Sequence, residues 1–276
     1  MLADAVHALG LPPETVVEPA GGASGDAWRV HTGAADYVLR VASSSRLTDS
    51  RLMAMEAART GGLPAPELIR RSSTPQGEVV LLSWLPGTPM FEALVDDPSA
   101  ARTLGRLAGD TQRRLHRVVA PVDVIDVASD GTHPFDAGRD VAWLPHGSAL
   151  LHLDWHPLNL LVDDSGTTIC GIVDWDNARR GHPLLDLART DGIVRFAPSL
   201  IGSEALRTRL AEFHEGWVDG YGPAAAAIPP SCHLWAGRVM LADVGHRFAD
   251  RPDALDDLRR WTASFEPARG PTRAAS

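Results

Sequence analysis

The residues whose types and spacing could support chemistry gather in one stretch, residues 150–180. Asp154 and Asn159 lie on one predicted loop of this stretch, and Asp174 and Asp176 lie on the next. In phosphoryl transfer, an aspartate orients or deprotonates the attacking hydroxyl, and an asparagine that follows it holds a magnesium ion. A carboxylate directly after an apolar strand can hold such an ion against the phosphates of a nucleotide. The order of these residues indicates a phosphoryl-transfer site.

A predicted β-hairpin joins the two loops. The apolar runs 160–162 and 169–173 flank the turn sequence 163–166, which is typical of a hairpin. Because a hairpin brings the ends of its strands together, we expect Asn159 and Asp174 to lie close in space. Amide and carboxylate oxygens are hard ligands, so this strand end is a predicted Mg²⁺ site.

The preceding part of the chain changes from strand composition to helical spacing. Residues 16–41 read as strands around the small-residue loop 21–25, and residues 50–60 read as a helix. An apolar strand over 78–85 is broken by Pro86 and the glycine after it. Mostly helical segments follow. This order predicts an α+β protein with two lobes and a cleft between them.

We place the domain boundaries accordingly. Residues 1–85 form the predicted N-terminal nucleotide-binding lobe, which is small and β-rich. Residues 86–266 form the larger, mainly helical C-terminal lobe for catalysis and substrate binding. Residues 267–276 are predicted to be a flexible tail.

Composition limits the classes of partner and compartment. The chain has 276 residues and a net charge of -9, which does not indicate a nucleic-acid partner. No stretch approaches the length of a membrane span, and the first residues lack the pattern of a signal peptide. Two cysteines are too few for a disulfide framework. We therefore expect a cytoplasmic protein with no membrane partner, as a monomer or a homodimer.

A second reading of the same polar residues is a two-metal hydrolase. His152, Asp154 and His156 alternate, and they could combine with Asp174 and Asp176. That reading predicts further clusters of histidine and carboxylate ligands elsewhere in the chain. A third reading, a pseudokinase that only binds nucleotide, conflicts with the intact set of acids and amide.

Three motifs resemble those of the aminoglycoside phosphotransferase family, which belongs to the wider class of protein-kinase-like enzymes. The motifs read HLDWHPLN at 152–159, VDWDNA at 173–178 and GHPLLDLA at 181–188. The family commonly has H-G-D-x-H-x-x-N, I-D-W-x-x-A and G-D-P-x-x-D-L-A. The resemblance covers roughly residues 16–261, and it implies a protein-kinase-like two-lobed fold. Leu153 replaces the usual glycine, and His182 replaces the usual aspartate.

The resemblance assigns roles in the catalytic stretch. Asp154 would be the catalytic carboxylate, and Asn159 and Asp174 would hold Mg²⁺. His152 would brace the loop, and Asp186 would anchor the catalytic segment from a helix start.

The resemblance also assigns a nucleotide site, for ATP or GTP. Arg40 stands where protein kinases carry a lysine, and its fork-shaped guanidinium would contact phosphates while Glu56 pairs with it. The small-residue loop, with Ser24 and Gly25, would cover the phosphates. The segment of Ser83, Trp84 and Leu85 would bind adenine through its backbone, so the nucleotide-binding residues are Arg40, Glu56, Ser24, Gly25, Ser83 and Leu85.

The acceptor is expected against the helices that follow Asp186. Acids and aromatics there would recognise a cationic molecule as a group, while each residue by itself is better explained as part of a solvated face or of the core. The candidates are Asp176, Glu212, Glu215, Trp217, Asp219, Trp235 and Asp243.

The resulting hypothesis is transfer of the γ-phosphate of ATP or GTP to a hydroxyl of a small molecule. The expected acceptor is an aminoglycoside or a basic peptide antibiotic of the capreomycin or viomycin type, which would confer antibiotic resistance by inactivation. A macrolide kinase, or a metabolite kinase acting on homoserine or choline, stays open as an alternative.

Overall fold

The structure is a computed structural model, and it describes most of the chain. The described residues are 2–12, 14–20, 27–33, 35–42, 45–127, 143–201, 204–244 and 252–267. The predicted phosphate loop, with Ser24 and Gly25, lies outside them, and so does the predicted tail after residue 267.

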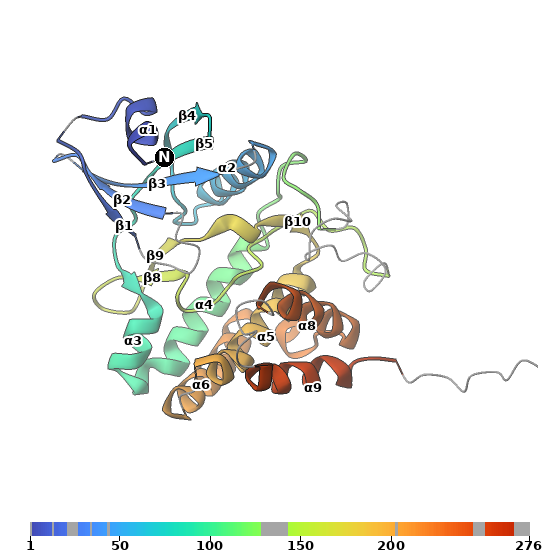
Figure 1. Ribbon diagram of the computed structural model, residues 1–276. Helices are drawn as coiled ribbons and strands as arrows, with labels where there is room; N and C mark the ends of the chain where they lie inside the picture. The colour runs from blue at the N-terminus through green and yellow to red at the C-terminus, as the bar shows by residue number, and fades with distance from the viewer. Residues whose placement is uncertain are drawn as a thin grey trace, which may run out of the picture.

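The N-terminal lobe is a five-stranded antiparallel sheet with a helix on each face (Figure 1). The strand order is β1-β2-β3-β5-β4. The strands are β1 (Val16–Pro19), β2 (Ala27–His31), β3 (Asp36–Ala42), β4 (Leu68–Thr74) and β5 (Gly77–Ser83). Helix α1 (Leu2–Ala8) covers one face and helix α2 (Ser45–Thr60) packs on the other.

Strand register decides which side chains face the second lobe. Leu39 is buried on the α1 side of the sheet, among the side chains of β2 and β5. Because side chains alternate along a strand, Val38 and Arg40 point to the opposite side. Arg40 lies opposite Ala27 on one neighbouring strand and Val80 on the other. It is therefore carried on the face of the sheet that looks toward the second lobe.

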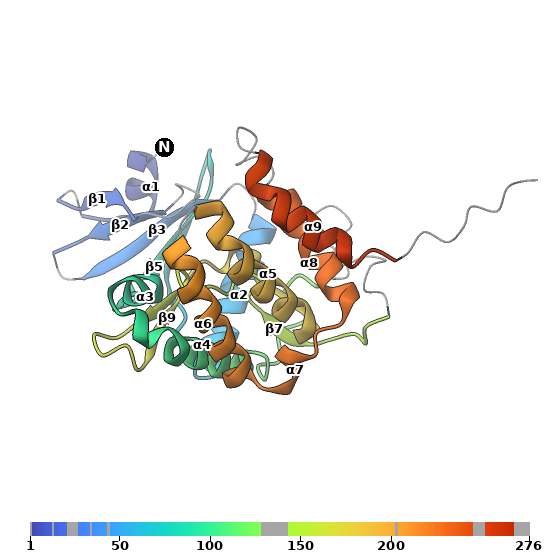
Figure 2. The ribbon, with the colours of Figure 1, turned by 90° about the horizontal axis from the view of Figure 1, so that it is seen from below.

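The C-terminal lobe is mainly helical and contains two small sheets (Figures 1 and 2). One sheet pairs β6 (Thr88–Pro89) with β8 (Leu160–Val162) and β9 (Ile169–Ile172), and the other pairs β7 (Ala149–Leu151) with β10 (Arg179–Gly181). The helices are α3 (Met90–Asp96), α4 (Ala101–Leu115), α5 (Pro183–Ile201), α6 (Glu204–Tyr221), α7 (Pro223–Ala226), α8 (Pro230–Val244) and α9 (Asp256–Ser264). Short 3-10 turns lie at η1 (Pro98–Ala100), η3 (Trp175–Asn177) and η4 (Pro252–Leu255).

Helices α4 and α6 touch backbone to backbone. A Cβ atom on Gly105 would lie 2.0 Å from the carbonyl oxygen of Phe213, and one on Gly216 would lie 2.0 Å from that of Arg102. Only glycine permits this approach. The pair forms the base of the lobe, against which α5 and then α8 and α9 pack (Figure 2).

The α+β architecture with two lobes is confirmed. We propose the lobe boundary at residues 85 and 86, because β5 belongs to the first sheet while β6 already pairs with β8 of the second lobe. Among the helices of the described residues, none combines the length and apolar character that a bilayer crossing needs.

Candidate active site

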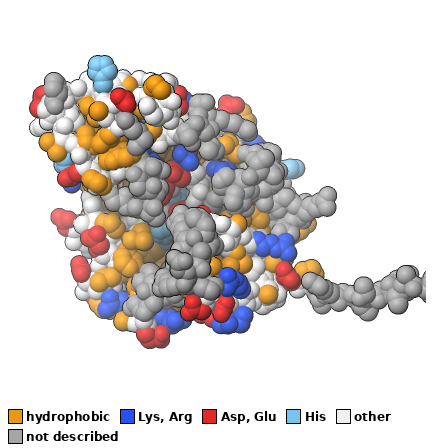
Figure 3. Space-filling model, viewed as in Figure 1, with side chains coloured by type: hydrophobic (Ala, Val, Ile, Leu, Met, Phe, Trp, Pro, Cys, Tyr) orange, Lys and Arg blue, Asp and Glu red, His pale blue; other side chains and the backbone are white. Residues whose placement is uncertain are grey.

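The β8–β9 hairpin joins the two polar loops as predicted. Leu160 lies opposite Ile172, and the backbone N–H of Val173 donates to the carbonyl oxygen of Asn159 at 3.0 Å. Asn159 and Asp174 are thus held at neighbouring positions where the two strands meet. In the space-filling view, acidic and basic side chains come together where the two lobes meet (Figure 3).

Asp154 and Asn159 are held together by hydrogen bonds within the loop. The Asn159 amide donates to the carbonyl oxygen of Asp154 at 2.9 Å and to its carboxylate at 3.2 Å. The His156 ring lies 3.4 Å from the same carboxylate. Burial alone would raise the pKa of Asp154, but the His156 ring and the more distant Arg189 guanidinium outweigh it and hold that pKa below its usual range. Asp154 is therefore a carboxylate at neutral pH, able to accept a hydrogen bond from a hydroxyl.

Asp174 follows β9 in a strained conformation. Its φ is 58°, in the left-handed region that residues with a side chain rarely adopt. The carboxylate is 46% exposed and lies 4.0 Å from the Arg40 guanidinium. Burial of the surrounding site, and then the charges of Asp176 and Asp154, raise the pKa of Asp174.

The residues present fit a divalent cation. Asn159 uses its amide nitrogen toward Asp154, which leaves its side-chain oxygen as a hard ligand beside Asp174. After burial, the charges of Asp176 and Asp154 raise the pKa of Asp174, and a bound cation would relieve this repulsion. Asn159 and Asp174 would hold Mg²⁺ by this chemistry, with positions left for water and phosphate.

The backbone of Leu153 is held on both sides by α5. Its N–H donates to Asp186 at 2.8 Å, and its carbonyl oxygen accepts from Nε of Arg189 at 3.1 Å. Leu153 has a φ of 61°, which explains why glycine is usual at this position. The two contacts hold the strained residue that immediately precedes Asp154.

Asp186 connects the catalytic loop to the end of α4. It lies in the first turn of α5, is fully buried, and also accepts from the backbone N–H of His152 at 3.0 Å. Its third partner is the His116 ring at 2.9 Å, which in turn contacts the Tyr221 hydroxyl at 2.8 Å. Burial would raise the pKa of Asp186, but the hydrogen bond to His116 and the neighbouring donors lower it.

His152 braces the two loops against each other. It is buried, its ring Nε2 donates to the carbonyl oxygen of Val173 at 3.0 Å, and the ring packs edge-on against Trp155 and Trp175. Burial lowers its pKa, so the ring is neutral. His182, the second departure from the family pattern, accepts from the backbone N–H of Leu184 at 3.3 Å at the start of α5, as a capping aspartate would.

The structure corrects the expected pairing of Arg40 with Glu56. Arg40 instead donates to both carboxylate oxygens of Asp176, at 2.7 and 2.6 Å. Glu56 accepts from Arg59, one turn along the same helix, and its side chain is 67% exposed. The reason is the rotation of α2, which buries Met55 and turns the next residue to solvent. Asp176, expected to face the acceptor, pairs with Arg40 of the N-terminal lobe instead.

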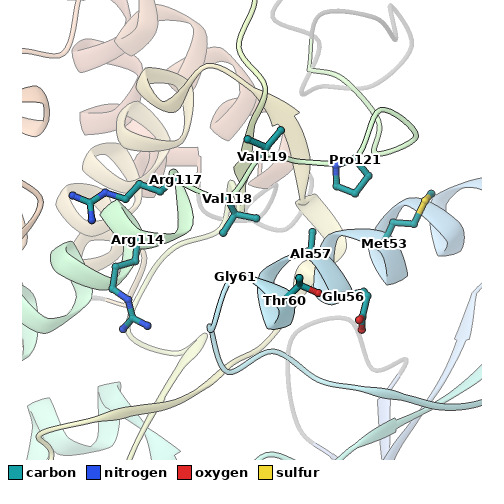
Figure 4. A pocket seen from close by; sticks show the side chains of 10 residues that line it. All are labelled: Met53, Glu56, Ala57, Thr60, Gly61, Arg114, Arg117, Val118, Val119 and Pro121. Carbon is teal, nitrogen blue, oxygen red and sulfur yellow. The ribbon is translucent and has the colours of Figure 1, made fainter.

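Glu56 lines a cavity of about 800 Å³ beside α2 (Figure 4). Its lining combines residues of α2 with the end of α4 and the segment that follows, and it includes Met53, Glu56, Ala57, Arg114 and Val118. The catalytic loops contribute no residue to this lining.

The predicted adenine segment runs along the exit from β5. The backbone N–H of Ser83 donates to the carbonyl oxygen of Glu67 at 2.8 Å, and the backbone N–H of Glu67 donates to the Ser83 hydroxyl at 2.9 Å. Leu85 is half-buried. Between them, Trp84 packs under the guanidinium of Arg29, whose Cζ lies 4.4 Å from the ring centroid. The role of this segment in binding adenine stays a prediction.

Several residues expected to bind the acceptor belong to the core or to a surface network. Trp217 and Trp235 are buried, and the Trp217 indole donates to Gln112 at 2.7 Å. Glu215 and Asp219 on α6 both accept from Arg102 on α4, at 2.9 and 2.8 Å. The close approach of α4 and α6 brings these opposite charges together on the exposed side of the pair.

The last two candidates for binding the acceptor are Glu212 and Asp243. Glu212 is exposed on α6, where its charge acts on Arg102. Asp243 lies 3.8 Å from the buried guanidinium of Arg189, so it supports the residue that holds Leu153. The structure therefore places the two aromatics in the core, and a role of the acids in binding the acceptor stays a prediction.

The hydrolase alternative needs clusters of metal ligands. Within the described ranges, no group of three or more histidine, cysteine, aspartate or glutamate side chains is arranged to hold a metal ion. The proposed Mg²⁺ site depends instead on one amide and one carboxylate, as the kinase reading requires.

Two arginines that contact the site residues were not identified from the sequence. Arg189 lies three residues after Asp186, the spacing that puts both on one face of a helix. Arg51 lies four residues before the buried Met55, so the same rule places it on the inner face of α2. Helical spacing from a known inward residue was the available signal in both cases.

Comparison with protein families gives one match across most of the chain. The sequence model described as a phosphotransferase enzyme family matches residues 15–144 and 137–227. A search of curated proteins by the same chain gave no match.

Comparison with solved structures shows the same fold at low sequence identity. A thermostable mutant of the aminoglycoside phosphotransferase APH(4)-Ia, in a ternary complex with ADP and hygromycin B, has a TM-score of 0.65 and 15% identity, over 98% of this chain and 99% of that chain. A microcompartment-associated aminopropanol kinase has a TM-score of 0.63 and 18% identity, over 96% and 94%. The aminoglycoside phosphotransferase APH(3'')-Id from Streptomyces rimosus, in complex with ADP and streptomycin, has 0.57 and 16%, over 81% and 91%.

Proposed function

The chain belongs to the phosphotransferase enzyme family, and we propose that it transfers the γ-phosphoryl group of ATP or GTP to a hydroxyl of a small molecule. The observation that supports this most directly is the grouping of Asp154, Asn159 and Asp174 at one end of the β8–β9 hairpin. Arg40 reaches the same place from the other lobe, 4.0 Å from Asp174. A general acid–base group, two cation ligands and a phosphate-binding cation are the parts that phosphoryl transfer needs.

The chain's own residues would act mainly by positioning and electrostatics. Asp154 accepts the hydrogen bond of the acceptor hydroxyl and orients its oxygen. Arg40 aligns the phosphates from the N-terminal lobe. Asp186 and Arg189 hold the backbone that carries Asp154. Mg²⁺ bound by Asn159 and Asp174 would supply neutralisation of phosphate charge.

For the acceptor, we propose a hydroxylated amine. Structures with this fold include aminoglycoside phosphotransferases with hygromycin B or streptomycin and an aminopropanol kinase. The small molecules in these names all carry amino and hydroxyl groups. The net charge of -9 is favourable for a cationic molecule. An aminoglycoside or a basic peptide antibiotic, with resistance by inactivation, is the first candidate. A metabolite amino alcohol is the second, and the aminopropanol kinase favours it.

The test is a nucleotide-consumption screen of the purified full chain with ATP or GTP and Mg²⁺. The panel contains aminoglycosides, capreomycin, viomycin, a macrolide, homoserine, choline and aminopropanol. We expect consumption with at least one hydroxylated amine, a product heavier by one phosphoryl group, and loss of both when EDTA removes the divalent cation. If no alcohol supports turnover while a divalent metal alone drives ester hydrolysis, the hydrolase reading replaces this function.

A further inference from the structure

Arg40, Asp176 and Arg51 form a trio that joins three separate elements. Arg40 comes from β3, Asp176 from the η3 turn after β9, and Arg51 from α2. Arg40 and Asp176 make a two-pronged ion pair at 2.7 and 2.6 Å, and their side chains are only 20% and 26% exposed. This geometry fixes the plane of the guanidinium as well as its position.

Arg51 completes the trio from the inner face of α2. Its Nε lies 3.5 Å from the carboxylate of Asp176, and its side chain is 24% exposed. That nitrogen is buried, and within the described residues it has no partner at hydrogen-bond geometry. The ion pair with Asp176 ties α2 to the η3 turn after the β8–β9 hairpin.

Glu56 cannot replace Asp176 as the partner of Arg40. Its carboxylate is directed to solvent and to Arg59, on the face of α2 that lines the outer cavity (Figure 4). A turn of the helix large enough to bring Glu56 inward would expose Met55. The helix thus offers the site an arginine where a carboxylate was expected.

We propose that Asp176, held by Arg51, is the residue that positions Arg40 for the phosphates of the nucleotide. This inference rests on the proposed function. Two guanidiniums share the carboxylate of Asp176, and Asp174 lies 4.0 Å from Arg40 on the side where Mg²⁺ would bind. A shift of α2 would be transmitted to Arg40 through Arg51 and Asp176. Both are positioning residues, since they act on the nucleotide through Arg40.

The experiment compares Asp176→Asn and Arg51→Met with Arg59→Met, a matched control on the same helix. Arg59 pairs with Glu56 and Glu67 at the surface. Calorimetry of ATP binding to the full chain without acceptor measures the effect on the nucleotide alone. We expect Asp176→Asn to weaken binding about tenfold or more, the loss of a bidentate charged contact. Arg51→Met should weaken it less, and Arg59→Met should match the wild type.

A double-mutant cycle tests the coupling. If Arg51 acts through Asp176, the double variant should weaken ATP binding by less than the product of the two single effects. Asp176→Glu, which keeps the charge, should recover part of the affinity. The KM for the acceptor should stay nearly constant in all variants, which a general loss of structure would not produce.

The outcomes separate the two proposals. If the wild type binds ATP while Asp176→Asn and Arg51→Met bind it equally well, or if their effects are independent, the positioning role is wrong and the proposed function stands. If the wild type binds neither ATP nor GTP, the proposed function is wrong and the inference falls with it.

Discussion

The carboxylate of Asp186 accepts the backbone N–H of Leu153 at 2.8 Å, across 33 residues of sequence. Arg189, one turn further along α5, donates to the carbonyl oxygen of the same residue at 3.1 Å. One helix face therefore holds both polar groups of a residue in the left-handed region, directly before the proposed catalytic carboxylate. The strain at Leu153 is maintained by α5, so the stability of variants at this position tests the strained geometry.

At Leu153 the glycine variant should be more stable than the alanine variant, which reverses the usual order of stability. Both replacements remove the same buried side chain, but alanine in the left-handed region costs roughly 1 kcal/mol that glycine does not. We expect Leu153→Gly to unfold at higher urea than Leu153→Ala. The matched control is Leu151, equally buried in β7, where alanine should be the more stable replacement. An alanine variant at Leu153 that is as stable as the glycine variant would contradict the strained geometry.

Replacement of Asp154 by asparagine should remove turnover and spare binding. The loss of a positioned acid–base group lowers rates roughly 10²- to 10⁴-fold. Because Arg40 is held by Asp176 and lies 4.0 Å from Asp174, the affinity for ATP and the melting temperature should change little. Steady-state kinetics and calorimetry measure the two effects. Asp164→Asn, an exposed acid in the turn of the same hairpin, is the control and should keep full activity. Substantial turnover by Asp154→Asn would remove that residue from the mechanism.

The acids of α6 should not influence the acceptor. Glu215→Gln and Asp219→Asn break exposed ion pairs with Arg102, and such pairs contribute at most about 1 kcal/mol to stability. We expect kcat/KM for the acceptor to stay within about twofold of the wild type, by the same weak coupling. The measurement is acceptor kinetics at saturating nucleotide. A loss of an order of magnitude in either variant would return this face to the substrate site.

The edge of the N-terminal sheet should lose stability as the pH rises past neutrality. Hydrogen bonds to Glu18 and then Asp36 raise the pKa of His31 above 6.5. A raised pKa in the folded state gives stability that is fully present below the unfolded pKa and lost as the pH rises through the folded pKa. The difference in melting temperature between wild type and His31→Asn should therefore be largest near pH 6, just under the ordinary histidine pKa of about 6.5, and shrink in alkaline buffer. An NMR titration of His31 locates the midpoint. A difference that grows with pH would contradict the ion pairs.

The sequence by itself determined the parts of the site whose geometry is local. The spacing of Asp154 and Asn159 within one loop, and the hairpin that leads to Asp174, follow from turn chemistry and strand pairing over a few residues. The resemblance to a family of kinases supplied the two-lobed fold. The sequence showed that Leu153 replaces the usual glycine, but the left-handed conformation of this residue came from the structure.

Only the tertiary structure decided which partners these residues meet. Helical periodicity shows which face of α2 is buried, but it does not show what the neighbouring element presents, so Arg40 met Asp176 while Glu56 turned to solvent. In the same way, the acids of α6 could be counted from the sequence, but their pairing with Arg102 depends on how closely α4 and α6 approach. Ion pairs between distant segments depend on the rotation and distance of packed elements, and no local pattern in the chain encodes those quantities.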